Sequence, residues 1–242
     1  MRFAKRRADW RLGRWTAKLA VSAYLNAPQN SCSLHDIEIR AASCGAPNAF
    51  VANEPADMTI SLSHRNGTAM CAVTRSGIAL GCDLELIEPR SAVFLADYFT
   101  AEEQALLARV SVADQPRLVT LLWSAKESTL KALHTGLRLD TRSVAVKLGA
   151  LPEQDERERC LTAVAALFPP SFGLCSWTPL QVQYGDGIFH GWWQYSGNLV
   201  RTLVAAPPPH QPILLRNESG SAGALHVAGH DSVSVDLAGR SF

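Results

Sequence analysis

The pattern of hydrophobic and polar positions predicts three helices. They cover residues 9–25, 100–110 and 120–134. The last stretch has no Gly or Pro, and its Leu, Ala, Lys and Glu content favours a helix. The second begins at Thr100 and carries Glu103 three residues later, which is the pattern of a capping box. The first is amphipathic, with apolar residues such as Trp15 and Leu19 on one side and arginines on the other.

Strands are predicted where apolar and polar residues alternate with a period of two. Residues 58–63, 69–74 and 78–86 alternate in this way. Asn66-Gly67 between the first two is a strong hairpin signal, so we expect a three-stranded meander. Further elements are expected as strands at 35–40, 143–148, 176–182, 191–195 and 199–205, and as a short helix near 160–167. Residues 207–242 are rich in Pro, Gly, Ser and His without a sustained period, which predicts a disordered tail.

The composition is that of an ordinary globular protein. The 242 residues are 47% hydrophobic and 19% charged with a formal net charge of +1, so nothing indicates a nucleic acid or a membrane surface as partner. No apolar run approaches the ~18 residues of a spanning helix, and the basic N-terminus does not resemble a signal peptide. We therefore expect a soluble cytoplasmic protein. The six cysteines form no C-x-x-C pair, which favours reduced thiols over a zinc site or a disulfide framework.

Two carboxylates share one face of the third predicted strand. Asp83 and Glu85 alternate with apolar residues and point the same way, about 7 Å apart along the strand. Like charges at this spacing repel unless a cation or hydrogen-bond donors lie between them, and oxygen ligands of this kind suit Mg²⁺. The alternative is an exposed sheet edge with two solvated acids, and this segment alone does not decide between them.

The helix at 120–134 carries an acid and a base one turn apart. Trp123, Glu127 and Lys131 fall on one stripe at 3.6 residues per turn. A Glu followed by a Lys four residues later is a common surface pair that contributes only ~0.2–0.5 kcal/mol. A catalytic pair is the other interpretation, because the segment also carries a Trp and the flanking Lys126 among small and apolar residues.

Basic residues follow one side of the first helix. Arg7, Arg11, Arg14 and Lys18 recur at helical spacing, preceded by Arg2, Lys5 and Arg6. Three interpretations stay open: a solvated face, an Arg-rich transit peptide, or a polyphosphate site, since guanidinium groups hold phosphate by paired, charge-assisted hydrogen bonds. His64 ends the first strand of the meander and is either an ordinary loop histidine or a site residue.

Three motifs together resemble the signatures of the 4'-phosphopantetheinyl transferases. They are Ser61-Leu62-Ser63-His64, Gly81-Cys82-Asp83-Leu84-Glu85, and Trp123-Ser124-Ala125-Lys126-Glu127-Ser128 followed by Lys131. The resemblance covers roughly residues 5–205, and the length is similar to that of the two-domain, surfactin-synthetase-activating type. Cys82 replaces the aliphatic residue usual in the family, and the N-terminal basic helix matches only loosely.

The resemblance implies both a fold and a reaction. The fold is an α+β pseudo-dimer of two similar halves, residues 1–104 and 105–206, followed by the 207–242 tail. The reaction transfers the 4'-phosphopantetheine arm of coenzyme A to a serine of an acyl, peptidyl or aryl carrier protein. The products are holo carrier protein and 3',5'-ADP, and the enzyme is expected to be a cytoplasmic monomer.

The resemblance also implies residue roles. Asp83, Glu85 and Glu127 would hold Mg²⁺, or Mn²⁺ in its place. Glu127 would take the proton of the serine hydroxyl, directly or through water, while Lys131 and Lys126 stabilise the departing phosphate. The residues expected to contact coenzyme A are Arg7, Arg14, Lys18, Ser63, His64, Asp83, Lys126 and Lys131.

A non-catalytic module that binds nucleotide or polyphosphate through the basic helix is the alternative function. In such a module Asp83 and Glu85 are merely solvated, and binding is equally strong in chelator. A stand-alone synthase devoted to the fatty-acid carrier protein is disfavoured, because those chains are about half this length and trimeric.

Overall fold

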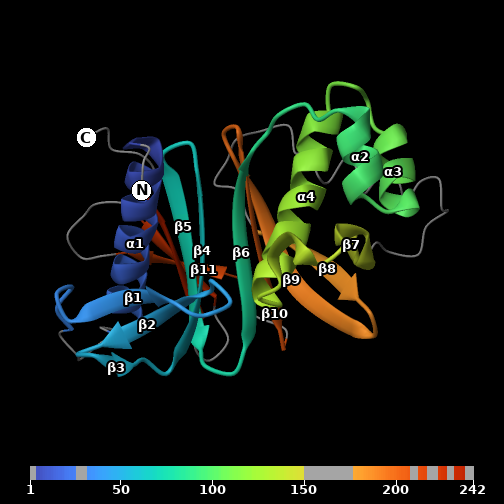
Figure 1. Ribbon diagram of the computed structural model, residues 1–242. Coiled ribbons are helices and arrows are strands. Elements are labelled where there is room, and N and C mark those ends of the chain that lie inside the picture. The colour runs from blue at the N-terminus through green and yellow to red at the C-terminus, as the bar shows by residue number, and fades with distance from the viewer. Residues whose placement is uncertain are drawn as a thin grey trace.

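The computed structural model describes residues 4–25, 32–149, 177–207, 212–216, 223–227 and 232–237, and its architecture is mixed α+β (Figure 1). The α+β class expected from the sequence is confirmed. The helix expected near residues 160–167 lies outside the described residues. The division at residues 104 and 105 and the similarity of two halves stay predictions. In the described part of the chain, no helix is long and apolar enough to span a membrane.

The helices occupy the N-terminus and the middle of the chain. They are α1 (Ala4–Leu25), α2 (Ala92–Tyr98), α3 (Ala101–Ala108), α4 (Gln115–Ala132) and the 3₁₀ helices η1 (Gly136–Arg138) and η2 (Thr141–Ser143). The capping box predicted at the start of α3 is present, with Thr100 and Glu103 bonding reciprocally. The helix predicted at 120–134 is confirmed as α4. It begins earlier than expected because Pro116 lies in its first turn, where no backbone N–H donor is required.

The strands form three sheets. The small sheet has the order β1-β2-β3, with β1 (Ile37–Ala41), β2 (Pro47–Val51) and β3 (Glu54–Pro55). The second has the order β6-β10-β9-β8-β7, with β6 (Ala79–Leu86), β7 (Val144–Leu148), β8 (Thr178–Tyr184), β9 (Gly187–Ser196) and β10 (Leu199–Ala206). The third has the order β11-β12-β13-β5-β4, with β4 (Met58–Arg65), β5 (Thr68–Arg75), β11 (Pro212–Arg216), β12 (Gly223–Val227) and β13 (Ser232–Leu237).

The predicted meander is half correct. β4 and β5 form the expected hairpin, and Asn66 and Gly67 both have positive φ, as a tight hairpin turn requires. The third strand, β6, does not continue this sheet. It pairs along its whole length with β10, more than a hundred residues later in the chain. The meander prediction was wrong because it assumed that strands adjacent in sequence pair through their backbones. Instead, serine side chains of β4 accept hydrogen bonds from the backbone N–H groups of β6.

Helix α1 packs against the β4–β5 hairpin (Figure 1). Its buried side consists of Gly13, Thr16, Ala17, Ala20 and Val21. These small residues allow the helix to lie close to Ile60 and Val73 of the sheet. Trp15, which the sequence placed on the apolar side, is instead 51% exposed. The bulky side chain does not fit the close side of this helix.

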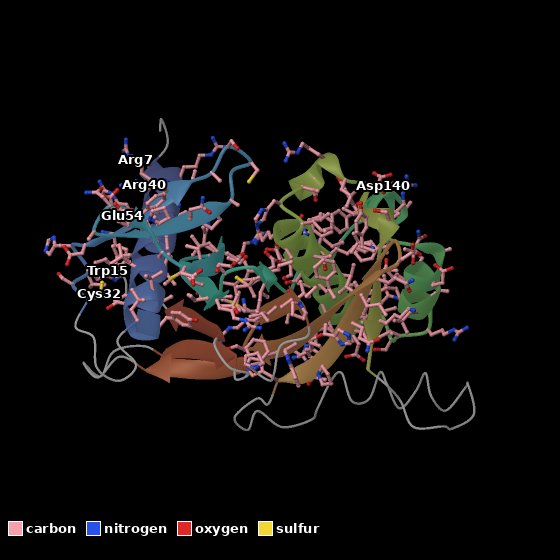
Figure 2. The ribbon with its side chains drawn as sticks, turned by 90° about the horizontal axis from the view of Figure 1, so that it is seen from below. Arg7, Trp15, Cys32, Arg40, Glu54 and Asp140 are labelled. Carbon is pink, nitrogen blue, oxygen red and sulfur yellow. The ribbon has the colours of Figure 1, made fainter. Side chains whose placement is uncertain are left out.

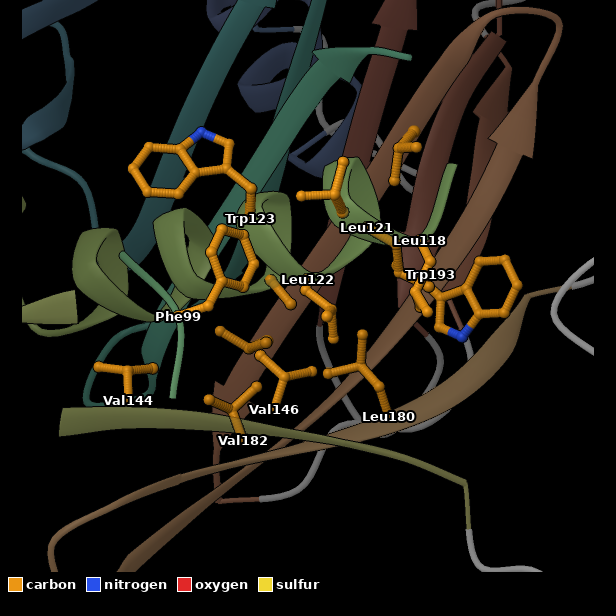
Figure 3. Packing of buried hydrophobic residues seen from close by; sticks show 14 of the residues in the cluster. Phe99, Leu118, Leu121, Leu122, Trp123, Val144, Val146, Leu180, Val182 and Trp193 are labelled. Carbon is orange, nitrogen blue, oxygen red and sulfur yellow. The ribbon is translucent and has the colours of Figure 1, made fainter. Parts of the chain in front are cut away.

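Helix α4 covers the second sheet, and α2 and α3 lie beside α4 on the side away from β6 (Figure 1). Leu118, Leu121 and Leu122 of α4 are fully buried in one cluster with Leu180 and Val182 of β8 (Figure 3). The ring of Trp123 packs edge-on against Phe94 and Tyr98 of α2. This aromatic cluster fixes the rotation of α4 about its axis and therefore which of its residues face β6.

The end of the chain differs from the prediction of a disordered tail. β11, β12 and β13 extend the third sheet, and β13 pairs antiparallel with β5 from Ser232↔Thr74 to Leu237↔Ala69. The sequence of β13 does alternate, but its six residues, between Asp231 and Ala238, are too short a run to stand out in a polar segment.

Candidate functional site

The site forms where α4 crosses β6, and Gly81 permits this crossing. A Cβ atom at Gly81 would lie 1.7 Å from the backbone oxygen of Ser128 and 2.8 Å from the nitrogen of Ala132. No side chain fits at that distance. The glycine thus brings the backbone of β6 against α4, and the next residues on the same face of β6, Asp83 and Glu85, point toward the helix.

Asp83 is the centre of the site. It is only 4% exposed, and three side chains from two elements, β4 and α4, donate hydrogen bonds to its carboxylate. Ser63 of β4 and Lys131 of α4 donate to Oδ1 over 2.9 Å and 2.7 Å, and Ser124 of α4 donates to Oδ2 over 2.9 Å. Ser63 in turn accepts from the backbone N–H of Leu84 at 3.1 Å. The carboxylate is therefore held in one orientation from three sides.

Lys131 connects this carboxylate to the surface. Its side chain is 29% exposed, and its ammonium group also donates to the backbone oxygen of Cys82 over 3.0 Å. Burial by itself lowers the pKa of Lys131, but the charge and hydrogen bond of Asp83, together with the charges of Cys82 and Glu127, outweigh it and the pKa is raised. Lys131 is therefore a fixed positive charge at neutral pH.

Glu127 lies one helical turn before Lys131 and is electrostatically coupled to the other carboxylates. Its pKa is raised from 4.5 to about 7, first by burial and then by the negative charge of Asp83, with a smaller contribution from Glu85. Lys131 opposes this rise. Glu127 is thus able to gain or lose a proton near neutral pH, which an ordinary surface glutamate does not do.

Glu85 is held by two arginines that sequence reasoning missed. Its side chain is 15% exposed, and Arg65 Nε and Arg90 lie 3.5 Å and 3.8 Å from its Oε2 atom. Burial and the charge of Asp83 raise the pKa of Glu85, and the two arginines partly offset this rise. Arg65 follows His64 at the end of β4, and no local pattern indicates that its charge serves a residue twenty positions later.

The carboxylates of Asp83, Glu85 and Glu127 are the type of ligand that a hard cation prefers, but they are not arranged around a common point. In the part of the chain that the structure describes, no group of three His, Cys, Asp or Glu side chains is arranged to hold a metal ion. The donor set nevertheless fits Mg²⁺, which prefers oxygen ligands. Asp83 raises the pKa of both glutamates, and the buried Oε2 of Glu85 accepts no hydrogen bond from any described residue. A cation would relieve this mutual repulsion.

A cleft of about 530 Å³ opens on the far side of Lys131, which pairs with Asp83, and the three carboxylates themselves do not line it. It lies between α1, β4 and the end of α4, and three predicted site residues line it: Arg14, His64 and Lys131. Burial lowers the pKa of Arg14, and its Nε atom is buried without a hydrogen-bond partner in the described structure. The guanidinium group lies 5.1 Å from the ring centroid of Trp10, which is 47% exposed at the cleft. The cleft thus has positive groups and an aromatic surface suited to a phosphorylated ligand.

Three other predicted ligands lie elsewhere. Arg7 is exposed on the N-terminal part of α1 (Figure 2) and does not line the cleft. Lys18 donates to the backbone oxygen of Leu34 over 3.2 Å, which holds α1 to the segment before β1. Ser63 points inward to Asp83 rather than into the cleft. Among the side chains of the basic stripe that the structure describes, Arg14 alone reaches the cleft.

Lys126, expected at the departing phosphate, is completely buried. Its ammonium group pairs with Glu103 over 2.9 Å and donates to the backbone oxygens of Thr141, over 2.8 Å, and Val144. Burial lowers the pKa of Lys126, and Glu103 opposes this. Glu103 also accepts from the backbone N–H of Val146. The structure therefore does not bring Lys126 to the carboxylates, and the lysine joins α4 to α3 and β7.

Similarity to known proteins covers the centre of this site. Residues 79–166 match the family model described as the 4'-phosphopantetheinyl transferase superfamily. The matched segment includes β6 and α4, with Asp83, Glu85, Glu127 and Lys131, but not Arg14 or His64 of the cleft. No curated protein sequence matches the chain. The match supports the superfamily that the motifs resemble and a phosphopantetheinyl transferase role in general.

Proposed function

We propose that the protein transfers the 4'-phosphopantetheine arm of coenzyme A to a serine hydroxyl of a carrier protein and releases 3',5'-ADP. One observation carries this proposal: Lys131 both pairs with Asp83, one of three electrostatically coupled carboxylates, and lines a cationic cleft. The family match supports the general activity, and coenzyme A and carrier proteins are the partners that it implies. We extend the proposal to the two-domain subtype, whose length the 242 residues resemble, and to a cytoplasmic monomer.

The carboxylates would hold the metal ion. Asp83, Glu85 and Glu127 supply oxygen ligands and excess negative charge, which suits Mg²⁺ or Mn²⁺. When bound, the ion would supply neutralisation of the charge that builds on the 3',5'-ADP leaving group as the pyrophosphate linkage of coenzyme A breaks. Arg65 and Arg90 keep Glu85 on the site side of β6 and limit the rise of its pKa.

Glu127 is the residue best suited to accept the proton of the attacking serine. A general base works most effectively when its pKa lies near the operating pH, and the pKa of Glu127 is about 7. It takes the proton from the hydroxyl directly or through one water molecule. The surface-pair interpretation of Glu127 and Lys131 does not account for a pKa so far from the ordinary range.

Lys131, Arg14 and His64 would bind the phosphates of coenzyme A. All three line the cleft, and the buried Nε of Arg14 lacks a partner among the described residues. Lys131 reaches from the cleft to Asp83, so it is placed to stabilise the negative charge of the departing phosphate. We assign Lys126 and Ser63 to holding the architecture, because their polar groups are satisfied by Glu103 and Asp83.

Mass spectrometry of apo carrier proteins tests the proposal. Several apo carrier proteins incubated with the enzyme, coenzyme A and Mg²⁺ should gain the mass of one phosphopantetheine group, and none should do so in chelator. The Glu127→Gln variant should be folded and strongly impaired. Coenzyme A binding that is equally tight in chelator, with no carrier protein modified, would instead identify a non-catalytic binding module, an alternative that the family match does not favour.

A further inference from the structure

A chain of buried hydroxyl groups runs from β10 to the carboxylate of Asp83. Thr202 of β10 lies opposite Asp83 in the β6–β10 ladder, and its hydroxyl is 2.9 Å from that of Ser124 and 2.7 Å from that of Ser128. Thr202, Ser124 and Ser128 are all completely buried. Thr202 lies outside the segment that matches the family model, and no sequence motif pointed to it.

The number of protons fixes the direction of this chain. A carboxylate oxygen accepts, so the hydroxyl of Ser124 donates its only proton to Asp83 Oδ2. Toward Thr202, Ser124 is then an acceptor, and Thr202 must donate to it. Since the proton of Thr202 is used in this way, Ser128 donates to Thr202 at 2.7 Å rather than to the Thr202 backbone oxygen at 3.3 Å. All three protons therefore point toward Asp83, an arrangement in which each bond strengthens the next.

The same accounting shows which oxygen of Asp83 remains available. Each carboxylate oxygen has about two acceptor positions. Oδ1 accepts from Ser63 and Lys131, so its positions are filled. Oδ2 accepts only from Ser124 among the described residues, and one of its positions stays open.

We propose that Thr202 is a positioning residue for Asp83, and that Oδ2 is the Asp83 atom that binds the divalent cation. By donating to Ser124, Thr202 keeps the hydroxyl proton of Ser124 directed at Oδ2 and prevents Ser124 from donating elsewhere. The carboxylate is thereby held with the open position of Oδ2 in a fixed direction. This inference rests on the proposed function for the identity of the cation, but it concerns the hydroxyl chain rather than the transfer reaction.

Manganese binding tests the proposal with a readout that does not require turnover. Mn²⁺ affinity of the full chain is measured by electron paramagnetic resonance, and thermal melts in chelator confirm that each variant is folded. Thr202→Val, which removes the hydroxyl at constant shape, should weaken Mn²⁺ binding by about tenfold. Thr202→Ser keeps the hydroxyl and should bind like wild type. Thr129→Val is the matched control, because Thr129 is equally buried but donates only to Ala125 within α4.

A double-mutant cycle provides the second test, and its Ser124→Ala arm applies even if Thr202→Val folds poorly. Ser124→Ala removes the bond to Oδ2 directly and should weaken Mn²⁺ binding at least as much as Thr202→Val. Because Thr202 acts through Ser124, the double variant should bind no more weakly than Ser124→Ala alone. Additive losses would show that Thr202 acts by another route and would overturn the proposal.

The remaining outcomes are also decisive. Wild-type affinity in Thr202→Val, an equal loss in Thr129→Val, or no Mn²⁺ binding by the wild-type chain would each overturn the role of the hydroxyl chain. Failure of the proposed function has a different signature: the wild type binds Mn²⁺ and Thr202→Val does not, yet no apo carrier protein is modified.

Discussion

At the residue scale, burial separates Asp83 from the solvated acid that its strand position suggested. The sequence placed Asp83 correctly on one face of β6 together with Glu85, because a period of two is a local property. It did not reveal that α4 covers this face. Replacing a solvated acid by Ala would leave the fold intact, but the contacts of Asp83 with Lys131, Ser63 and Ser124 predict a loss of stability.

Asp83→Ala should lower stability as well as abolish transfer. The variant leaves the ammonium group of Lys131 and two buried hydroxyls without their acceptor, at a cost of about 1–3 kcal/mol. Asp83→Asn keeps an acceptor oxygen and should be closer to wild type in stability while remaining inactive. Urea unfolding of both variants at pH 7 measures the difference. Equal free energies of unfolding for Asp83→Ala and wild type would show that these bonds add nothing.

The raised pKa of Glu127 predicts that the stability of the metal-free protein depends on pH. Its pKa is about 7 in the folded chain against 4.5 in the unfolded chain, so the folded state binds the proton more tightly. The stability from this group is complete below about pH 4.5 and is lost as the pH rises through about 7, by at most about 3 kcal/mol.

Glu127→Gln should remove this loss. Relative to wild type the variant should gain stability between pH 5 and pH 8, because the amide stays neutral throughout. Denaturant unfolding in chelator at both pH values measures the gain, and Glu102→Gln on the exposed side of α3 is the control. A stability difference between variant and wild type that does not change with pH would contradict the raised pKa.

At the element scale, the site depends on the close crossing of β6 and α4. Local features of both elements were predictable, since the α4 pattern and the β6 alternation are properties of contiguous residues. Their contact was not predictable from either pattern, because it depends on β6 pairing with the distant β10. The same reason applies to Lys126, for which the resemblance implied a role at the phosphate: the residue is adjacent to Glu127 in sequence, but its burial depends on Glu103 and on the segment before β7.

Gly81→Ala should separate these two elements. The new methyl group would lie 1.7 Å from the backbone oxygen of Ser128, so the helix must shift, with a loss of at least about 3 kcal/mol and of activity. Gly13→Ala is the matched control, because its Cβ would meet only His64 at 3.5 Å and α1 should gain roughly 0.5–1 kcal/mol. Thermal unfolding of both variants measures this contrast. A stable, active Gly81→Ala variant would mean that the crossing is not tight.

Helix α1 allows a test of the cleft, because only part of its basic stripe lines it. Arg14→Ala should weaken coenzyme A binding and reduce its salt dependence, since exposed phosphate contacts are screened over ~8–10 Å at physiological salt. Arg11→Ala, on the exposed side of the same helix, should change neither quantity. Titration calorimetry at low and high salt measures both. If coenzyme A affinity depended on salt equally in the two variants, the whole basic stripe would be a solvated face without a binding role.

At the scale of the whole molecule, the class and most elements followed from the sequence, while the connections between distant segments did not. The β4–β5 hairpin was readable from Asn66-Gly67, and the strands of the second sheet from their alternation. The pairings that join the start of the chain to its end, β6 with β10 and β5 with β13, have no local signal. They also decide which residues meet at the site, as Thr202 and Asp83 show.

Removal of residues 208–242 distinguishes the two views of the C-terminal segment. As a disordered tail it would contribute nothing to stability, whereas in the structure its loss leaves β5 as an unpaired edge beneath α1. The ladder between β13 and β5 consists of hydrogen bonds worth roughly 0.5–1.5 kcal/mol each, so the truncated chain should lose about 3 kcal/mol of stability. It should also aggregate more readily through the exposed edge. The elements that build the site, α1, β4, β6, α4 and β10, all remain, so kcat/KM at low temperature should stay close to that of the full chain. Denaturant unfolding, light scattering and transfer assays at low temperature test this separation. A truncated chain with unchanged stability would show that β13 does not contribute to the sheet, and an inactive but stable one would show that the segment acts on the site itself.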